Sequence, residues 1–393
     1  MITYILYFVL LFILLYFDAG NPTFAQIWKM PIFVYCLWYI FTHHIKQKAP
    51  THLKWGYWWG IKNFFNFGIV NYAVQNVTSC VKFTILPVLI DFLRKTFKDK
   101  EKLFNTSLIF SQYVILSSIP FLLGFLESPG KALEYDDVKS FSGIFSVQHT
   151  CSIITSMASV FVLFTLFNYK KYTLKWFYNL FLYILAAIVV YKAFTRTGWA
   201  MFGIGTILVY FYQKQTFVKK VLTFLVSLIF LVIIYNSFVV GNERLDNRLN
   251  DRSNGYQQSA GSGRNTFRRV SLKYWEEGNI AEQLIGYGID PLKDNMMKKI
   301  GARLYSHNGF VDALVANGII GIILLSGFCL TSLAFALKRR KHKYAPISIS
   351  CIIMYIAFQL IQGGTFTFQD FLMAAAIVLI YENKQSCSKQ VKC

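Results

Sequence analysis

The stretch GFVDALVANGIIGIILLSGFCLTSLAFAL, residues 309–337, decides the fold of this chain. A helix advances about 1.5 Å per residue and the hydrocarbon core of a bilayer is about 30 Å thick, so an apolar run of this length predicts a membrane-spanning helix. His307 and Asn308 immediately precede the run. We therefore expect a spanning helix that begins directly after a polar segment.

The whole chain has the composition of an integral membrane protein. Of its 393 residues, 55% are hydrophobic, 18% are aromatic and only 15% are charged, which lies outside the averages of soluble proteins. Apolar stretches of spanning length predict about twelve transmembrane helices in one all-α polytopic domain over residues 1–393. Their approximate bounds are residues 1–17, 28–42, 55–71, 74–92, 103–126, 146–167, 174–194, 198–212, 218–240, 309–337, 345–361 and 365–381.

The net charge is +21, and the distribution of Lys and Arg among the loops predicts the orientation of these helices. Lys and Arg mostly occupy short turns rather than one basic face, so the charge does not indicate a nucleic-acid partner. Cytoplasmic loops are enriched in Lys and Arg, which places every second turn and both termini in the cytoplasm. The basic turns are HHIKQKAPTHLK, RKTFKDKEK, YKKYTLK, QKQTFVKK and KRRKHKY.

The opposite, extracytoplasmic side receives the less basic loops. The longest is a loop at residues 241–308, inserted between the ninth and tenth predicted spans. A signal peptide is the alternative for residues 1–17, but a basic n-region and a small-residue cleavage site are absent, so we expect a first membrane helix. The sequence thus predicts one long polar loop on the outer side.

The sequence contains none of the common metal or nucleotide motifs. The 7 cysteines lie in predicted spans or in the C-terminal tail, without metal-ligand spacing. The patterns GxxxxGK[ST] and HExxH are absent as well. We expect no cofactor and no metal.

Arginines of the long outer loop are the first candidates for a binding site. The segment SGRNTFRRVSLKYW predicts an amphipathic helix at the membrane interface, and Arg264 and Arg268 lie four residues apart on one face of it. Two guanidiniums so placed match a diphosphate, which Arg binds in a bidentate manner. Arg269 and Arg303 are further substrate-binding candidates, and His307 follows at the end of the loop.

Other basic residues have competing interpretations. Arg196 lies just before a helix predicted to start at Gly198, where it either binds an anion or reaches the lipid headgroups. Lys82 lies near the outer end of its span and is a candidate for the same anion site. In NERLDNRLNDR, residues 242–252, the arginines alternate with acids, which favours a solvated cap. His307 is either a site residue or a polar residue at a helix start.

Several segments together resemble one known family, the bacterial O-antigen ligase and polysaccharide polymerase superfamily of Wzy-type polymerases and WaaL-type ligases. The similarity covers roughly residues 141–325. The segments that carry it, in order, are FSGIFSVQHTCSI (141–153), TRTGW (195–199), SGR (262–264) with the aromatic-rich helix and GYG (286–288) that follow it, and SHNGFVDALVANGIIGIILL (306–325).

This resemblance implies a GT-C-like membrane glycosyltransferase that uses undecaprenyl-diphosphate-linked sugars at the outer face of the bacterial cytoplasmic membrane. It matches Arg196, Arg264 and His307 to the arginines and the histidine of the family's motifs, as catalytic residues. The chain departs from the pattern at SVQHT, which replaces an asparagine-containing stretch, and at Phe267, where a tryptophan is usual.

We expect a metal-independent polymerase of lipid-linked oligosaccharide repeat units, with arginines holding the diphosphate. His307 or a carboxylate such as Asp136 or Asp137 would deprotonate the acceptor hydroxyl. A ligase that transfers polymer to a lipid or cell-wall acceptor is the alternative enzyme, and a flippase or secondary transporter is the alternative of another class. Lys62 and Lys82 within spans favour transport. The family also implies a chain-length regulator and a flippase as partners in the pathway.

Overall fold

The computed structural model describes residues 2–21, 24, 27–44, 48–129, 134–135, 138–213, 264–364 and 367–382. The predicted span 218–240, the acidic pair Asp136 and Asp137, and the arginines of segment 242–252 lie outside the described residues. The described part is almost entirely helical. Its only strands, β1 (Glu134–Tyr135) and β2 (Val138–Lys139), form one short antiparallel pair.

The helices follow the predicted apolar stretches closely. Their bounds are α1 (Ile2–Gly20), α3 (Lys29–His44), α4 (Thr51–Lys62), the 3-10 helix η1 (Phe67–Ile69), α5 (Ala73–Thr96), α6 (Lys100–Leu116), α7 (Ile119–Leu122), α8 (Gln148–Asn168), α9 (Leu174–Lys192), α10 (Arg196–Tyr212), α13 (Arg264–Glu276), α14 (Ile280–Ile285), α15 (Ile289–Ile300), α16 (Gly309–Lys338), α17 (Ala345–Ile361) and α18 (Thr367–Val378).

Among the described helices, α5, α8, α9 and α16 are long and apolar enough to cross a membrane, and further apolar helices are shorter. This agrees with a membrane protein. The predicted span at residues 55–71 is shorter than expected, because α4 ends at Lys62. Beyond that point Asn63 donates from Nδ2 to Trp59 O at 2.8 Å, a local side-chain bond that competes with helix continuation.

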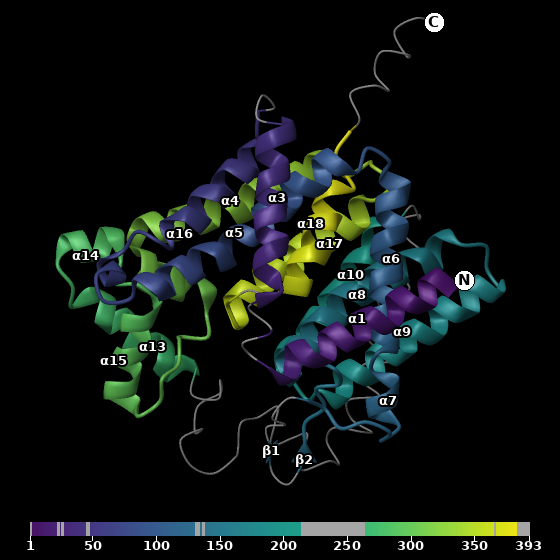
Figure 1. Cartoon of the computed structure of the whole chain (residues 1–393), viewed down its shortest axis with the longest axis horizontal. Helices are drawn as coiled ribbons and strands as arrows, with labels where there is room; N and C mark the ends of the chain where they lie inside the picture. The colour runs from purple at the N-terminus through teal and green to yellow at the C-terminus, as the bar shows by residue number, and fades with distance from the viewer. Residues whose placement is uncertain are drawn as a thin grey trace, which may run out of the picture.

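The bundle is built around α8, most of whose side chains are buried. In Figure 1, α6, α8, α9 and α10 lie together on the right, α4, α5 and α16 on the left, and α17 and α18 between them. Small residues allow the close packing: a Cβ on Gly198 would lie 2.4 Å from Ser152 Cβ, and one on Gly205 would lie 2.8 Å from Met354 Sδ. Helices α8, α10 and α17 are therefore held in tight contact.

The turns at one end of the bundle are the basic ones. His52 Nε2 lies 2.6 Å from the Tyr381 hydroxyl, and Lys343 Nζ lies 3.4 Å from Glu101 Oε2. Three basic turns and the end of α18 thus meet at this end. The less basic turns meet at the other, where Phe141 N donates to Lys192 O at 3.1 Å.

Helix α16 is broken near its middle, at Gly318 (φ 69°, ψ −169°). The break exposes backbone carbonyls that the preceding GYG segment satisfies: Tyr287 N donates to Val315 O at 3.1 Å, and Gly288 N to Ala316 O at 2.8 Å. Gly286 and Gly288 have φ of 87° and 95°, a region that favours glycine. The GYG segment therefore docks into the break as a short ladder of backbone hydrogen bonds.

Substitution of Gly286 tests this docking. Gly286→Ala puts a Cβ 2.4 Å from Asn317 N in addition to the positive φ, whereas Gly301→Ala has a φ of 72° and nothing within 4 Å. We expect Gly301→Ala to cost about 1 kcal/mol from the backbone alone, and Gly286→Ala about 1 to 3 kcal/mol more from the forced displacement. Thermal unfolding of the purified proteins in detergent measures both, and equal losses would contradict the docking.

Candidate functional site

Helix α13 begins against the C-terminal end of α17. Arg264 donates from Nη1 to Ile361 O at 3.2 Å and from Nη2 to Gln362 Oε1 at 3.0 Å. Arg268, one turn further, donates from Nη2 to Leu360 O at 3.2 Å. The predicted pairing of Arg264 and Arg268 on one helix face is thus present, and both guanidiniums are directed at the same turn of α17.

The opposite face of α13 explains this placement. Phe267, Val270 and Tyr274 pack against a small core formed by Leu292, Met296 and Val315. Burial of this apolar stripe fixes the rotation of α13 about its own axis, so that Arg264 and Arg268 face α17. The amphipathic pattern of the sequence therefore determines that Arg264 and Arg268 face α17.

His307 lies beside the arginines. Its ring centroid is 5.8 Å from that of Phe267 and 5.7 Å from that of Tyr305, and its φ is 54°. Gln362 Nε2 lies 3.3 Å from His307 Nδ1. Because Gln362 Oε1 accepts from Arg264, its amide nitrogen faces the histidine, so Nδ1 accepts and the neutral ring carries its proton on Nε2.

The charge state of His307 follows from its surroundings. Burial, followed by the positive charges of Arg264 and Arg268, lowers its pKa from 6.5 to about 4. The imidazole is therefore neutral near pH 7. A neutral ring with a fixed tautomer can donate a hydrogen bond from Nε2 to a group that becomes negative during a reaction.

Asn308 joins the same region as the N-cap of α16. Its Oδ1 accepts from Phe310 N at 3.0 Å and Val311 N at 3.1 Å, and its Nδ2 donates to Leu360 O at 2.9 Å. A Cβ on the next residue, Gly309, would lie 2.0 Å from Gln359 Oε1. The start of α16 and the end of α17 are therefore in direct contact.

Arg196 is the first residue of α10, at the same end of the bundle. Its N-cap Thr195 accepts from Gly198 N at 3.2 Å and lies 2.7 Å from Ser152 Oγ. Helix α10 packs along α8 and α17. Of the predicted catalytic residues, the structure brings Arg264 and His307 together, through Gln362.

The other predicted binding residues are placed differently. Arg269 is exposed on α13. Arg303 is 52% exposed and pairs with Asp294 at 2.8 Å and Asp290 at 3.2 Å, so its charge is already partly neutralised. Lys62 donates to Phe65 O and Ile285 O, each at 2.6 Å, which ties the end of α4 to α14. Lys62 therefore makes structural contacts.

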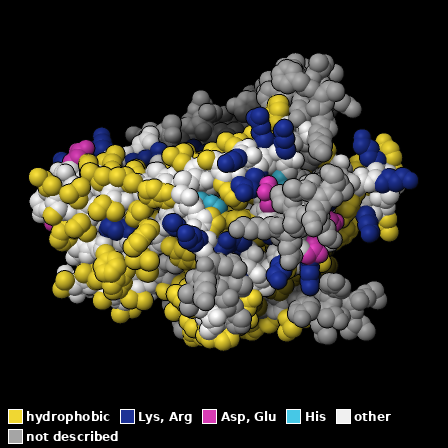
Figure 2. Space-filling model, turned by 90° about the horizontal axis from the view of Figure 1, so that it is seen from above, with side chains coloured by type: hydrophobic (Ala, Val, Ile, Leu, Met, Phe, Trp, Pro, Cys, Tyr) yellow, Lys and Arg dark blue, Asp and Glu magenta, His cyan; other side chains and the backbone are white. Residues whose placement is uncertain are grey.

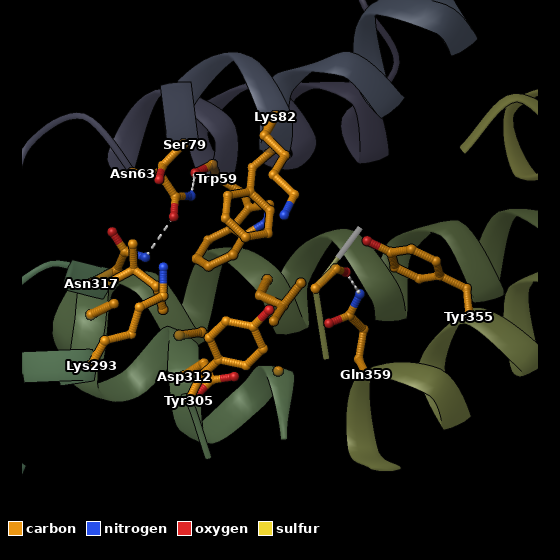
Figure 3. A pocket seen from close by; sticks show the side chains of 17 residues that line it. Trp59, Asn63, Ser79, Lys82, Lys293, Tyr305, Asp312, Asn317, Tyr355 and Gln359 are labelled. Carbon is orange, nitrogen blue, oxygen red and sulfur yellow. Dashed lines mark hydrogen bonds between the residues drawn. The ribbon is translucent and has the colours of Figure 1, made fainter. Parts of the chain in front are cut away.

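Lys82 lines a cavity of about 130 Å³ next to the arginine and histidine group. Helices α4 and α5 form one wall and α15, α16 and α17 the others, and Lys82 directs its amine into the space from α5 (Figure 3). Gly309 and Gln359 belong to the lining. Gly309 lies two positions after His307 in the chain, and Gln359 directly precedes Leu360. The polar side chains of the lining are Asn63, Ser79, Lys82, Lys293, Tyr305, Asp312, Asn317, Tyr355 and Gln359.

The face of the molecule that is seen from above combines charge and apolar area. On the face seen in Figure 2, Lys and Arg gather near the middle, and apolar side chains cover the part to the left. In Figure 1 that part is formed by α4, α14 and α16. Exposed apolar side chains of α16, such as Ile319, Ile323 and Leu330, suit a lipid environment.

Sequence reasoning missed several residues of the site. Gln359 and Gln362, three residues apart at the end of an apolar span, are buried, and each faces a residue at the start of α16. The sequence pattern that could have identified them is a pair of amide side chains on one helix face just before Gly363 and Gly364. Asp312 in the first turn of α16 was missed because it reads as an ordinary charge at a helix start.

The pH dependence of stability tests the environment of His307. Its pKa is about 4 in the folded protein and 6.5 when unperturbed, so in this interval the unfolded chain binds more protons and stability falls as pH falls. We expect His307→Gln to lose less thermal stability than the wild type between pH 6.5 and pH 4, measured by unfolding in detergent. The same slope in both proteins would show that His307 is not held neutral.

Comparison with known proteins agrees with the family resemblance of the sequence segments described above. Residues 181–326 match the family model Wzy_C, described as O-antigen ligase. The matched region includes Arg196, Arg264, Arg268 and His307. A search of curated proteins gave no match. This match at residues 181–326 confirms the resemblance to the O-antigen ligase and polysaccharide polymerase superfamily.

Proposed function

We propose that this protein is a membrane glycosyltransferase that polymerises oligosaccharide repeat units linked to undecaprenyl diphosphate. The growing chain is the donor, and a single lipid-linked repeat unit is the acceptor. The reaction takes place at the outer face of the bacterial cytoplasmic membrane, with both termini of the protein in the cytoplasm. The family match supports an enzyme of polysaccharide biosynthesis, and the polymerase activity is our proposal.

The observation that carries this proposal is the group formed by Arg264, Arg268 and His307 at the end of α17. Both guanidiniums donate to neutral oxygens at the C-terminal end of α17. Arg268 Nε is buried and has no hydrogen-bond partner among the described residues. Such a donor is costly unless a ligand satisfies it. A diphosphate provides both the negative charge and the acceptors.

The residues can assist departure of the diphosphate in a defined way. As the bond between the anomeric carbon and the phosphate oxygen breaks, negative charge develops on the leaving group. Arg264 and Arg268 stabilise this charge, and the Nε2 proton of His307 is available as a further donor. Arg196 at the start of α10 adds positive charge at the same end of the bundle. No step in this scheme requires a metal ion.

The ligase alternative uses the same chemistry. The matched family is described as O-antigen ligase, and a ligase would also release undecaprenyl diphosphate from the donor. The two activities differ only in the acceptor, so the test below separates them by the product that accumulates. A flippase of the same pathway would supply the repeat units, and a chain-length regulator would act on the product.

The lipid-linked glycans of cells that lack this protein test the proposal. Cells are complemented with wild type, Arg264→Ala or the control Lys273→Ala, whose side chain is 72% exposed on the same helix. We expect single lipid-linked repeat units to accumulate without the protein. Wild type and Lys273→Ala restore long polymer, whereas Arg264→Ala lowers its rate of formation at least about 100-fold at equal membrane levels, because a donor to the developing charge is lost.

Other products would contradict the polymerase assignment. Long lipid-linked polymer that fails to reach its final acceptor identifies a ligase. Repeat units trapped at the cytoplasmic face identify a flippase, and they would also overturn the role assigned to the arginines.

A further inference from the structure

We propose that the cavity between α4, α5, α15, α16 and α17 holds the sugar that carries the acceptor hydroxyl, and that Asp312 removes the proton of this hydroxyl. The inference rests on the proposed function and assigns the residue that activates the acceptor hydroxyl. His307 cannot easily take the proton through Nε2, because its Nδ1 already accepts from Gln362 and Nε2 carries the ring proton. The base must therefore come from elsewhere.

The volume of the cavity suits one monosaccharide. A water molecule requires about 10 to 15 Å³ of comparable space, so 130 Å³ corresponds to about ten waters, close to the number of heavy atoms in a hexose. Trp59 and Tyr305 line the space with aromatic surface, on which the apolar face of a sugar ring can pack. The cavity can therefore hold the terminal sugar of a repeat unit.

The polar groups of the lining match a ligand that is rich in hydroxyls. Asn317 is 2% exposed, and its Oδ1 is buried without a hydrogen-bond partner among the residues that the structure describes. Its Nδ2 donates to Asn63 Oδ1 at 2.9 Å, which fixes the amide (Figure 3). An unsatisfied buried acceptor of this kind indicates a missing donor.

Asp312 is held at the edge of the cavity nearest the arginines. Its Oδ1 accepts from Ser306 N at 2.9 Å, and its own N donates to Asn308 O at 2.8 Å. A carboxylate has two oxygens with about four acceptor positions, so the bonding of Asp312 to Ser306 leaves capacity for a hydroxyl. Asp312 and His307 are thereby fixed on the two sides of one short turn.

Two amines accompany this carboxylate. Lys82 and Lys293 line the same cavity from opposite walls, and Lys293 Nζ lies 5.5 Å from the Tyr305 ring centroid. The positive charge of Lys293 favours the ionised form of the Asp312 carboxyl group that a general base needs, and so opposes the effect of burial. In this arrangement the sequence-predicted Lys82 acts in the acceptor cavity.

The step balances without another reactant. The acceptor O–H transfers its proton to the Asp312 carboxylate while the oxygen forms a bond to the anomeric carbon of the donor. The bond from that carbon to the phosphate oxygen breaks, and its electron pair leaves with the diphosphate toward Arg264 and Arg268. Asp312 then returns the proton to solvent or to the released diphosphate.

Asp312→Asn in the purified full-length protein tests this inference. Asn retains an oxygen that can accept from Ser306 N, so the turn is preserved. The substrate is the lipid-linked repeat unit extracted from cells that lack the protein, and undecaprenyl diphosphate alone is the probe for binding, read as a thermal shift. We expect turnover to fall at least about 100-fold and to lose its acid-side pH dependence. Binding of undecaprenyl diphosphate should be unchanged.

Two further variants complete the test. Glu277→Gln removes a carboxylate that is 54% exposed at the end of α13 and should retain wild-type turnover. Tyr305→Phe removes one hydroxyl from the cavity and should raise the KM for the repeat unit about 10-fold, because one hydrogen bond is lost. This variant tests the cavity even where Asp312→Asn does not fold.

The outcomes separate this inference from the proposed function. Wild-type turnover and pH profile in Asp312→Asn, or an unchanged KM in Tyr305→Phe, would overturn the acceptor assignment while polymerisation by the wild type stands. Failure of the wild type to convert the repeat unit would overturn the proposed function itself. Loss of undecaprenyl diphosphate binding in Asp312→Asn would place the diphosphate in the cavity and contradict the division of the two sites.

Discussion

The break in α16 is the constraint on which the arrangement of the site depends. An uninterrupted helix would use the carbonyls of Val315 and Ala316 internally. The positive φ of Gly318 frees them, and Tyr287 N and Gly288 N bind them instead. A buried carbonyl without a partner is costly, so the GYG segment and the break stabilise each other. The segment that follows α13 and α14 is thereby fixed against α16.

This docking has consequences on both sides of α16. On one side it fixes α14 and α15 and the small core that orients α13, so that Arg264 and Arg268 face the end of α17. On the other side it places Asn317 in the cavity with an unused acceptor. Broken helices are a frequent way to bring polar groups to a site inside a membrane protein. Here a single break shapes both the arginine group and the cavity.

The charge state of His307 follows from its burial near the fixed positive charges of Arg264 and Arg268. The guanidiniums beside His307 disfavour its protonation, so the ring stays neutral and acts through the Nε2 proton. Gln362 bridges Arg264 and His307 and sets this tautomer. In the proposed reaction the arginines stabilise the leaving diphosphate and Asp312 deprotonates the acceptor. These separate roles are a consequence of the fixed hydrogen-bond network.

The sequence by itself determined the membrane class, most helix bounds, and the amphipathic helix with Arg264 and Arg268 on one face, because hydrophobic length and 3.6-residue periodicity are local properties. The family segments also made His307 a candidate site residue from the sequence. Only the tertiary structure decided that α4 ends at Lys62, that Arg303 pairs with Asp290 and Asp294, and that Gln362 fixes His307. These outcomes depend on contacts between residues far apart in the chain, and no local pattern encodes which partners the packing of helices brings together.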